Sequence, residues 1–191
     1  SHAHHTPKEN GELQDMGISW ARAGCLVLVP DHLGHGERRQ HPFVTSESYA
    51  KPFRVSRQDY YFRYDNDYRL ELLGDGLMGW LVHDLNRCFD ALLLEKGIDN
   101  GSLILLGAVA GGGDPCAVTA ALNGRISCAV PFNFGGPQPE TRFPLPDDVE
   151  TSFNYAVRGG WESTRNLRGS TGGGFLPWVI VGSIAPRRLI F

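Results

Sequence analysis

The feature that most constrains this chain is the stretch from Leu103 to Pro115, which reads Leu-Ile-Leu-Leu-Gly-Ala-Val-Ala-Gly-Gly-Gly-Asp-Pro. Its first four residues are apolar without interruption, which is typical of a strand buried on both faces of a parallel sheet. The glycines predict a tight turn, and Asp114 followed by Pro115 is a helix-start signal. The stretch therefore predicts a strand, a turn and a helix, the repeating unit of α/β proteins.

Four apolar runs along the chain predict strands, and they lie at residues 25–30, 103–107, 126–132 and 187–191. Amphipathic segments separate these runs, and alternation of this kind is typical of a parallel sheet joined by right-handed crossovers. The sequence therefore predicts an α/β fold with a parallel sheet and helices on both faces. No repeat or composition shift divides it, so residues 1–191 are expected to form a single domain.

The longest helix is expected at 78–96, where one stripe repeats at helical spacing. The stripe consists of Leu81, Leu85, Cys88 and Leu92. Shorter helices are expected at 13–23, 116–122 and 177–184. Residues 39–75 show neither the apolar spacing of a helix nor that of a strand, because aromatic residues are mixed there with Arg and Asp. This segment is open to three interpretations: a cap over the active-site edge, a sugar subsite, or an irregular packed excursion.

Composition excludes several classes of partner. The formal net charge is −3, which gives no reason to expect nucleic acid or an anionic membrane as a partner. No apolar run approaches the roughly 20 residues that a membrane-spanning helix needs. The four cysteines stand far apart without a C-x-x-C pair, and we expect them to be reduced packing residues. The sequence leaves the cellular compartment open.

Two motifs follow predicted strands. Gly107-x-Val109-x-Gly111 has the spacing of the G-x-S-x-G nucleophile elbow, with valine in the serine position. Asp31-x-x-Gly34-His35-Gly36 follows the first predicted strand, at the edge where ligands gather in α/β sheets. With the stretch at 130–141, these motifs resemble the central part of an α/β-hydrolase. The chain is most similar to the microbial acetylxylan-esterase-like carbohydrate esterases.

This resemblance implies particular site residues. Val109 takes the nucleophile position without being nucleophilic, and the backbone N–H groups of Ala110 and Ala3 are the implied oxyanion donors. The resemblance also implies that the first three strands lie before Ser1, and that the acid and histidine loops lie beyond Phe191. The domain is then incomplete. The missing third strand leaves a gap inside the sheet, and unpaired edges favour association with a second copy or a missing segment.

A second interpretation of the turn remains open. Asp114 as N-cap and Pro115 as the first helical residue would start the helix later, with Gly111–Gly113 as a flexible loop that was never a catalytic elbow. Asp114 is the nearest acidic group, and helix capping is its expected role.

Polar side chains near the same edge are candidate ligand contacts. They are Arg38, Asn133, Gln138, Glu140 and Trp161, of which Trp161 offers a stacking face. The alternative is that they hold down the long Gly/Pro-rich connection at 133–174. A Zn²⁺ site built from the histidines near the N-terminus and those of the Asp31 motif lacks H-x-x-x-H or H-E-x-x-H spacing. No metal or cofactor is therefore expected.

Two functional hypotheses follow. The first is an α/β-hydrolase-fold protein related to acetylxylan-type esterases, without a complete Ser-His-acid triad. All seven histidines precede residue 84, whereas the family's base follows the last strand. The second is a non-catalytic module on the same fold for ligand binding or assembly. The expected partner is a carbohydrate ester or another small polar ligand, and a homo-oligomer is the expected assembly.

Overall fold

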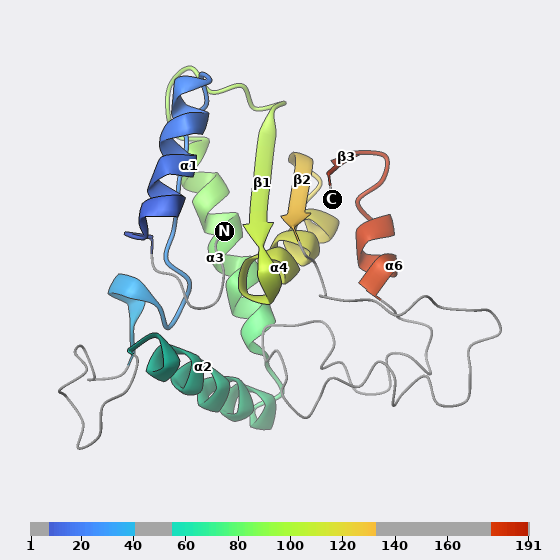
Figure 1. Ribbon diagram of the computed structural model, residues 1–191. Coiled ribbons are helices and arrows are strands. Elements are labelled where there is room, and N and C mark those ends of the chain that lie inside the picture. The colour runs from blue at the N-terminus through green and yellow to red at the C-terminus, as the bar shows by residue number, and fades with distance from the viewer. Residues whose placement is uncertain (1–7, 41–54, 133–176, 191) are drawn as a thin grey trace.

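The computed structural model describes residues 8–40, 55–132 and 177–190, and they form an α/β structure (Figure 1). Its sheet has the order β1-β2-β3, from β1 (Leu103–Ala108), β2 (Ile126–Phe132) and β3 (Arg188–Leu189). Every pairing is parallel, as predicted. The strands predicted at 103–107 and 126–132 are confirmed, and the one at 187–191 is confirmed over two residues.

The amphipathic helix is also confirmed, as α3 (Leu77–Leu92). Its inward face consists of Leu77, Leu81, Leu85 and Phe89. Leu85 and Phe89 pack into the main core, with Leu103 and Leu105 of β1. The predicted stripe is therefore confirmed at Leu81 and Leu85, whereas Cys88 and Leu92 are only half-buried and Phe89 takes the inward position.

Helix α4 (Val109–Leu122) corrects the prediction of a helix at 116–122, because it begins directly after β1. Gly111–Gly113 belong to the helix and are buried, so they are not a flexible loop. Asp114 is fully buried inside the helix and is not its N-cap, and Pro115 lies in its middle. Glycine and proline disfavour helix interiors, so tertiary packing has overridden local propensity here.

The strand predicted at 25–30 is a second correction. These residues are extended but belong to no sheet in the described part of the chain. Their side chains alternate in exposure, as in a strand, with Leu26 and Leu28 more exposed than Val27 and Val29. A strand is assigned by its backbone ladder with a neighbour. Residues 25–30 therefore have the side-chain pattern of a strand, but no strand among the described residues pairs with them.

Three more helices complete the described structure. They are α1 (Gly11–Arg22), α2 (Val55–Leu72) and α6 (Pro177–Gly182). Asn10 caps α1, since its side-chain oxygen accepts the backbone N–H of Glu12 at 3.0 Å. Helix α2 corrects the interpretation of 39–75 as an irregular excursion, because 18 of those residues are helical. No helix among the described residues combines the length and apolar character needed to cross a membrane.

The core lies between the sheet and the helices α3, α4 and α6. Besides the α3 and β1 residues it contains Cys116, Ala120, Ile126, Ala129 and Ile184. Ala117 of α4 packs on Ile180 and Val181 of α6. All four cysteines are free in this structure, and Cys116 is buried in the core, whereas Cys25, Cys88 and Cys128 are half-buried.

Candidate functional site

The turn between β1 and α4 is built by a close approach of two backbones. A Cβ atom at Gly107 would lie 2.0 Å from the carbonyl oxygen of Gly112 and 2.7 Å from Cβ of Cys116. Only glycine therefore lets α4 pass over the end of β1. The helix starts at Val109 with Ala108 as its N-cap residue, and no side chain caps it. Ala110 lies in the first turn, where backbone N–H groups have no partner within the helix.

Among the described residues, the side chains considered as nucleophiles at this turn are unsuited to that role. Val109 carries a hydrocarbon side chain, which cannot attack an ester. The Cys116 thiol donates to the carbonyl oxygen of Leu105 at 3.3 Å, and burial raises its pKa to about 12. Ser127 Oγ donates to the carbonyl oxygen of Leu103 at 2.9 Å. A thiol with such a pKa is protonated at neutral pH and therefore unreactive.

The loop after the extended segment is organised by Asp31. Its buried carboxylate accepts the backbone N–H of Lys8 at 2.8 Å through Oδ1, and that of Glu37 at 3.2 Å through Oδ2. The Lys8 ammonium lies 3.3 Å from Oδ2. Gly36 has a positive φ of 51°, and a Cβ atom there would lie 2.3 Å from the same carboxylate. The glycine thus makes room for the acid, and the motif has a structural role.

These contacts set the ionisation of Asp31. Burial on its own would raise the pKa of this carboxyl, but the two backbone N–H donors and the Lys8 ammonium outweigh it and hold the pKa below 3.8. A lowered folded-state pKa means that the unfolded chain binds the proton first as the pH falls. The stability contributed by Asp31 is therefore present above pH 3.8 and is lost as the pH falls through the folded-state pKa.

We expect Asp31→Asn to lower the free energy of unfolding by about 1.5–3 kcal/mol near pH 7, because charge-assisted hydrogen bonds are removed. The deficit should shrink as the pH falls below 3.8 and through the folded-state pKa, because the wild-type carboxylate is then protonated as well. A series of urea unfolding curves of both proteins, from pH 7 downwards, measures it. A deficit that stays the same size throughout the series would contradict the assignment.

Asp67 is a control for this experiment, because its pKa is shifted in the opposite direction from that of Asp31. Burial raises its pKa, although the backbone N–H of Leu77 donates to its Oδ1 at 2.8 Å. Its ionised form therefore costs stability as the pH rises through the folded-state pKa. The free energy of unfolding of Asp67→Asn should therefore rise relative to that of the wild type as the pH rises. The asparagine amide keeps the acceptor oxygen but carries no charge.

A second buried network joins the Asp31 loop to α2. His35 Nε2 lies 2.6 Å from Nη1 of Arg63, and His35 Nδ1 lies 3.7 Å from Asp59 Oδ2. Arg39 donates to both oxygens of Asp59, through Nε at 2.5 Å and Nη2 at 2.9 Å. A guanidinium only donates, so Nε2 of His35 must be an acceptor, which assigns the neutral ring with its proton on Nδ1. His35 is therefore not a free base.

The residues predicted as ligand contacts are placed only in part. Arg38, at the end of the helical turn η1 (Gly36–Arg38), pairs with Asp84 of α3 at 2.5 Å and donates to the carbonyl oxygen of Asp31 at 3.4 Å. It ties the loop to α3. Four other predicted contacts and one oxyanion donor lie outside the described residues: Asn133, Gln138, Glu140, Trp161 and Ala3.

The histidines His32 and His35 are both buried. Among the described residues, no group of three or more His, Cys, Asp or Glu side chains is arranged to hold a metal ion. The described residues therefore give two separate features: a loop held by charge pairs at Asp31, and a strand–turn–helix at Val109.

The sequence interpretation missed the acidic and basic residues of α2. Asp59, Arg63 and Asp67 recur every four residues and are all buried, so they form the inward face of this helix. Their Asp-Arg-Asp pattern at i, i+4 and i+8 was the available signal. It was overlooked because an inward helix face is normally recognised by apolar residues.

Comparison of the chain with protein-family models, with curated proteins and with solved structures gave no match.

Proposed function

We propose that this chain is an α/β-hydrolase-fold protein related to the acetylxylan-type carbohydrate esterases, in which the turn that carries the nucleophile remains and the nucleophile does not. The observation that supports the proposal is the direct passage from β1 into α4 at Val109. A turn of this kind presents its central residue above the sheet, close to the N–H groups of the helix.

A second candidate function is non-catalytic binding of a carbohydrate ester or another small polar ligand on the same fold. Val109 favours it, because removal of a serine nucleophile costs several orders of magnitude in rate. The pairing of His35 with Arg63 favours it as well, since that imidazole has no lone pair left to act as a general base.

Acetyl transfer from p-nitrophenyl acetate tests the proposal. The wild-type chain should release p-nitrophenol at the buffer rate. Val109→Ser should become acetylated once, because the helix N–H groups stabilise the oxyanion, but should not turn over without a base to activate water. Val109→Ala is the matched control and should stay unmodified, as measured by intact-protein mass spectrometry.

Two results would contradict the proposal. Wild-type turnover above the buffer rate that a serine-directed inhibitor abolishes would mean that a nucleophile exists elsewhere in the chain. Equal acetylation of Val109→Ser and Val109→Ala would mean that the turn has no oxyanion-stabilising geometry, and that the strand–turn–helix is only structural.

A further inference from the structure

The chain contains three Asn-Gly pairs, which are Asn10-Gly11, Asn100-Gly101 and Asn123-Gly124. Asparagine is a thermolabile residue, and glycine after it gives a direct route for loss of the side-chain amide. A bond forms between the glycine nitrogen and Cγ of the asparagine, the Cγ–Nδ2 bond breaks, and ammonia leaves with the proton of the attacking nitrogen. Water then opens the resulting succinimide ring to aspartate or isoaspartate. Glycine allows this approach because it has no Cβ.

Two of the three pairs are held by hydrogen bonds at the asparagine. Asn123 Nδ2 donates to Oδ1 of Asn86 at 2.6 Å, and its Oδ1 accepts the backbone N–H of Arg125 at 3.0 Å. Asn10 caps α1 with its side-chain oxygen, and its carbonyl oxygen accepts the backbone N–H of Gln14 at 3.0 Å. The amide and the backbone of the asparagine must both rotate before Cγ can be attacked, so these bonds restrain the reaction.

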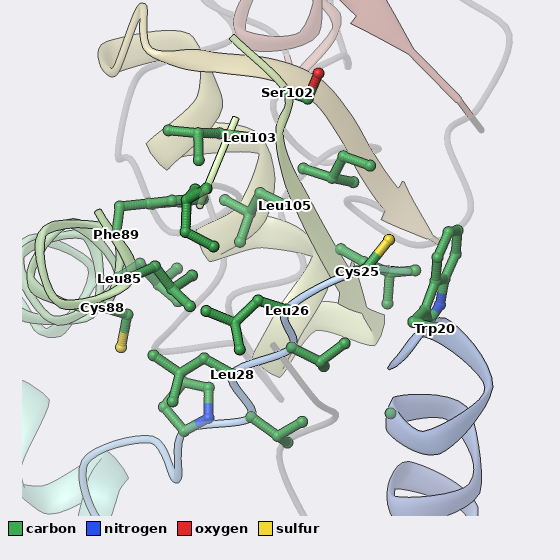
Figure 2. Close-up of a pocket in the computed structure, with 18 of the residues that line it drawn as sticks. Trp20, Cys25, Leu26, Leu28, Leu85, Cys88, Phe89, Ser102, Leu103 and Leu105 are labelled. Atoms are coloured by element: carbon green, nitrogen blue, oxygen red, sulfur yellow. The ribbon is translucent and has the colours of Figure 1, made fainter. Parts of the chain in front are cut away.

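Asn100 lies in an exposed turn at the entry to β1. Asn100 and Gly101 are both exposed, and the turn leads through Ser102 to Leu103, the first residue of the strand (Figure 2). Among the described residues, none forms a hydrogen bond with the side chain of Asn100. The amide of this asparagine is therefore able to rotate towards the next backbone nitrogen without breaking a bond to the described part of the chain.

The attacking nitrogen at this turn is restrained by Asp99. Oδ1 of Asp99 accepts the backbone N–H of Gly101 at 2.9 Å, and Ser102 Oγ donates to Oδ2 at 2.5 Å. The Ser102 hydroxyl and the Gly101 N–H hold the pKa of Asp99 below 3.8, so its carboxylate is ionised at neutral pH. A hydrogen bond to an acceptor of this kind stabilises the protonated form of the donor. The bond is exposed to water, and exposed bonds of turns open more readily than those of the core.

We propose that Asn100 is a site of spontaneous deamidation, in which Gly101 supplies the attacking nitrogen and Asp99 slows the reaction. The product carries a second carboxylate next to that of Asp99. In its isoaspartate form the backbone also runs through Cβ of residue 100, which lengthens the chain just before β1. This inference is independent of the chemistry at Val109, and either can fail without the other.

Incubation of the native chain at mildly alkaline pH, followed by tryptic digestion and mass spectrometry, tests the proposal. Asn100 and Asn123 lie in one tryptic peptide, residues 97–125, so fragment ions assign the amide-to-acid mass change to one or the other. Asn100 should convert at least about tenfold faster than Asn123. In guanidinium chloride, which removes the restraining hydrogen bonds, the two rates should become similar. Absence of conversion at Asn100, or equally fast conversion of Asn123 in the native chain, would overturn the proposal.

A pair of glycine variants tests the attacking nitrogen. Gly101→Ala should slow the conversion of Asn100 at least about tenfold, because the new Cβ crowds the nitrogen. That Cβ would lie 3.3 Å from Oδ1 of Asp99, at the end of an exposed side chain that can move. Gly124→Ala is the matched control, since a Cβ there meets nothing within 4 Å, and it should leave the conversion of Asn100 unchanged. Equal conversion of Asn100 in the two variants would contradict attack by the Gly101 nitrogen.

Asp99→Ala tests the restraint on that nitrogen. Without the carboxylate, the Gly101 N–H loses its acceptor and the neighbouring negative charge is gone, so Asn100 should convert at least about threefold faster. The conversion of Asn123 in the same peptide is the internal control and should stay at the wild-type rate, which shows that the fold is intact. Unchanged or slower conversion of Asn100 would overturn the restraining role of Asp99.

Discussion

Replacement of Gly107 by alanine is expected to lower the free energy of unfolding by about 3–5 kcal/mol, a large part of the 5–15 kcal/mol that stabilises a typical domain. The new Cβ atom would lie 2.0 Å from the carbonyl oxygen of Gly112, which belongs to the helix backbone and cannot rotate away. Relief requires α4 to move off β1. That movement opens the core around Cys116 and Leu105, where strand and helix are joined by the thiol hydrogen bond.

Thermal and urea unfolding of Gly107→Ala measure this loss. At about 2–4 °C per kcal/mol for a chain of this size, the midpoint should fall by roughly 6–20 °C. Gly124→Ala is the control, because a Cβ atom there meets nothing within 4 Å. It should change the free energy of unfolding by less than about 0.5 kcal/mol. A similar small effect at Gly107 would show that α4 does not pass this closely over β1.

The sequence predicted the elements whose burial is apolar. The stripe at Leu81 and Leu85 and the uninterrupted runs at 103–107 and 126–132 reflect hydrophobic burial, which local periodicity reports directly. Parallel pairing followed from the alternation of these elements along the chain.

Helix α2 was not predicted, because its inward face is ionic. The periodicity of Asp59, Arg63 and Asp67 is helical, but these residue types are rarely buried without partners. Their partners come from elsewhere in the chain: Arg39 for Asp59, His35 for Arg63 and the start of α3 for Asp67. Such pairing depends on the tertiary fold, which local sequence does not report.

The start of α4 was placed too late for a related reason. Asp114 and Pro115 are a correct local signal for a helix start, and in isolation three glycines would not be helical. The carbonyl oxygen of Gly112 lies directly over Gly107, so this part of the chain is held against the end of β1. Packing against β1 and β2 therefore decides the conformation of Gly111–Gly113, against their propensity.

The sequence predicted where the loop of the candidate site lies along the chain, but not which residues contact it. The spacing of Gly34 and Gly36 after Asp31 indicated a tight loop, and both glycines have positive φ. Which groups that loop binds depends on Lys8 and Arg63, which are distant in sequence. For this reason the histidines of the motif, considered as metal ligands from the sequence, are instead buried within the loop.

Arg63→Met is the second change with a large expected effect, a loss of about 3–5 kcal/mol in the free energy of unfolding. Arg63 is 1% exposed, and its side chain packs so closely on Gly34 that a Cβ atom there would lie 2.3 Å from its Cγ. Methionine keeps most of this packing and removes the charge. Asp67 then loses the guanidinium whose charge lowers its pKa, and His35 loses the Nη1 donor.

The dependence on pH distinguishes loss of charge from loss of packing. Without Arg63 the pKa of Asp67 rises further, because burial already raises it and the opposing cation is gone. The ionised carboxylate then costs more stability at neutral pH, and protonation removes that cost. The deficit of Arg63→Met in urea unfolding should therefore be smaller near pH 4 than near pH 7, by the same linkage. A packing defect alone gives a deficit that is independent of pH.

Arg125→Met is the matched control for this experiment. Arg125 pairs with Asp90 at 2.8 Å, but its side chain is 46% exposed, so water replaces the lost partner. Its removal should cost less than about 1 kcal/mol at either pH. A similar small loss for Arg63→Met would mean that the ionic face of α2 does not hold this helix against the Asp31 loop. A large, pH-dependent loss at Arg63 alone would establish that buried charge pairs hold the Asp31 loop against α2.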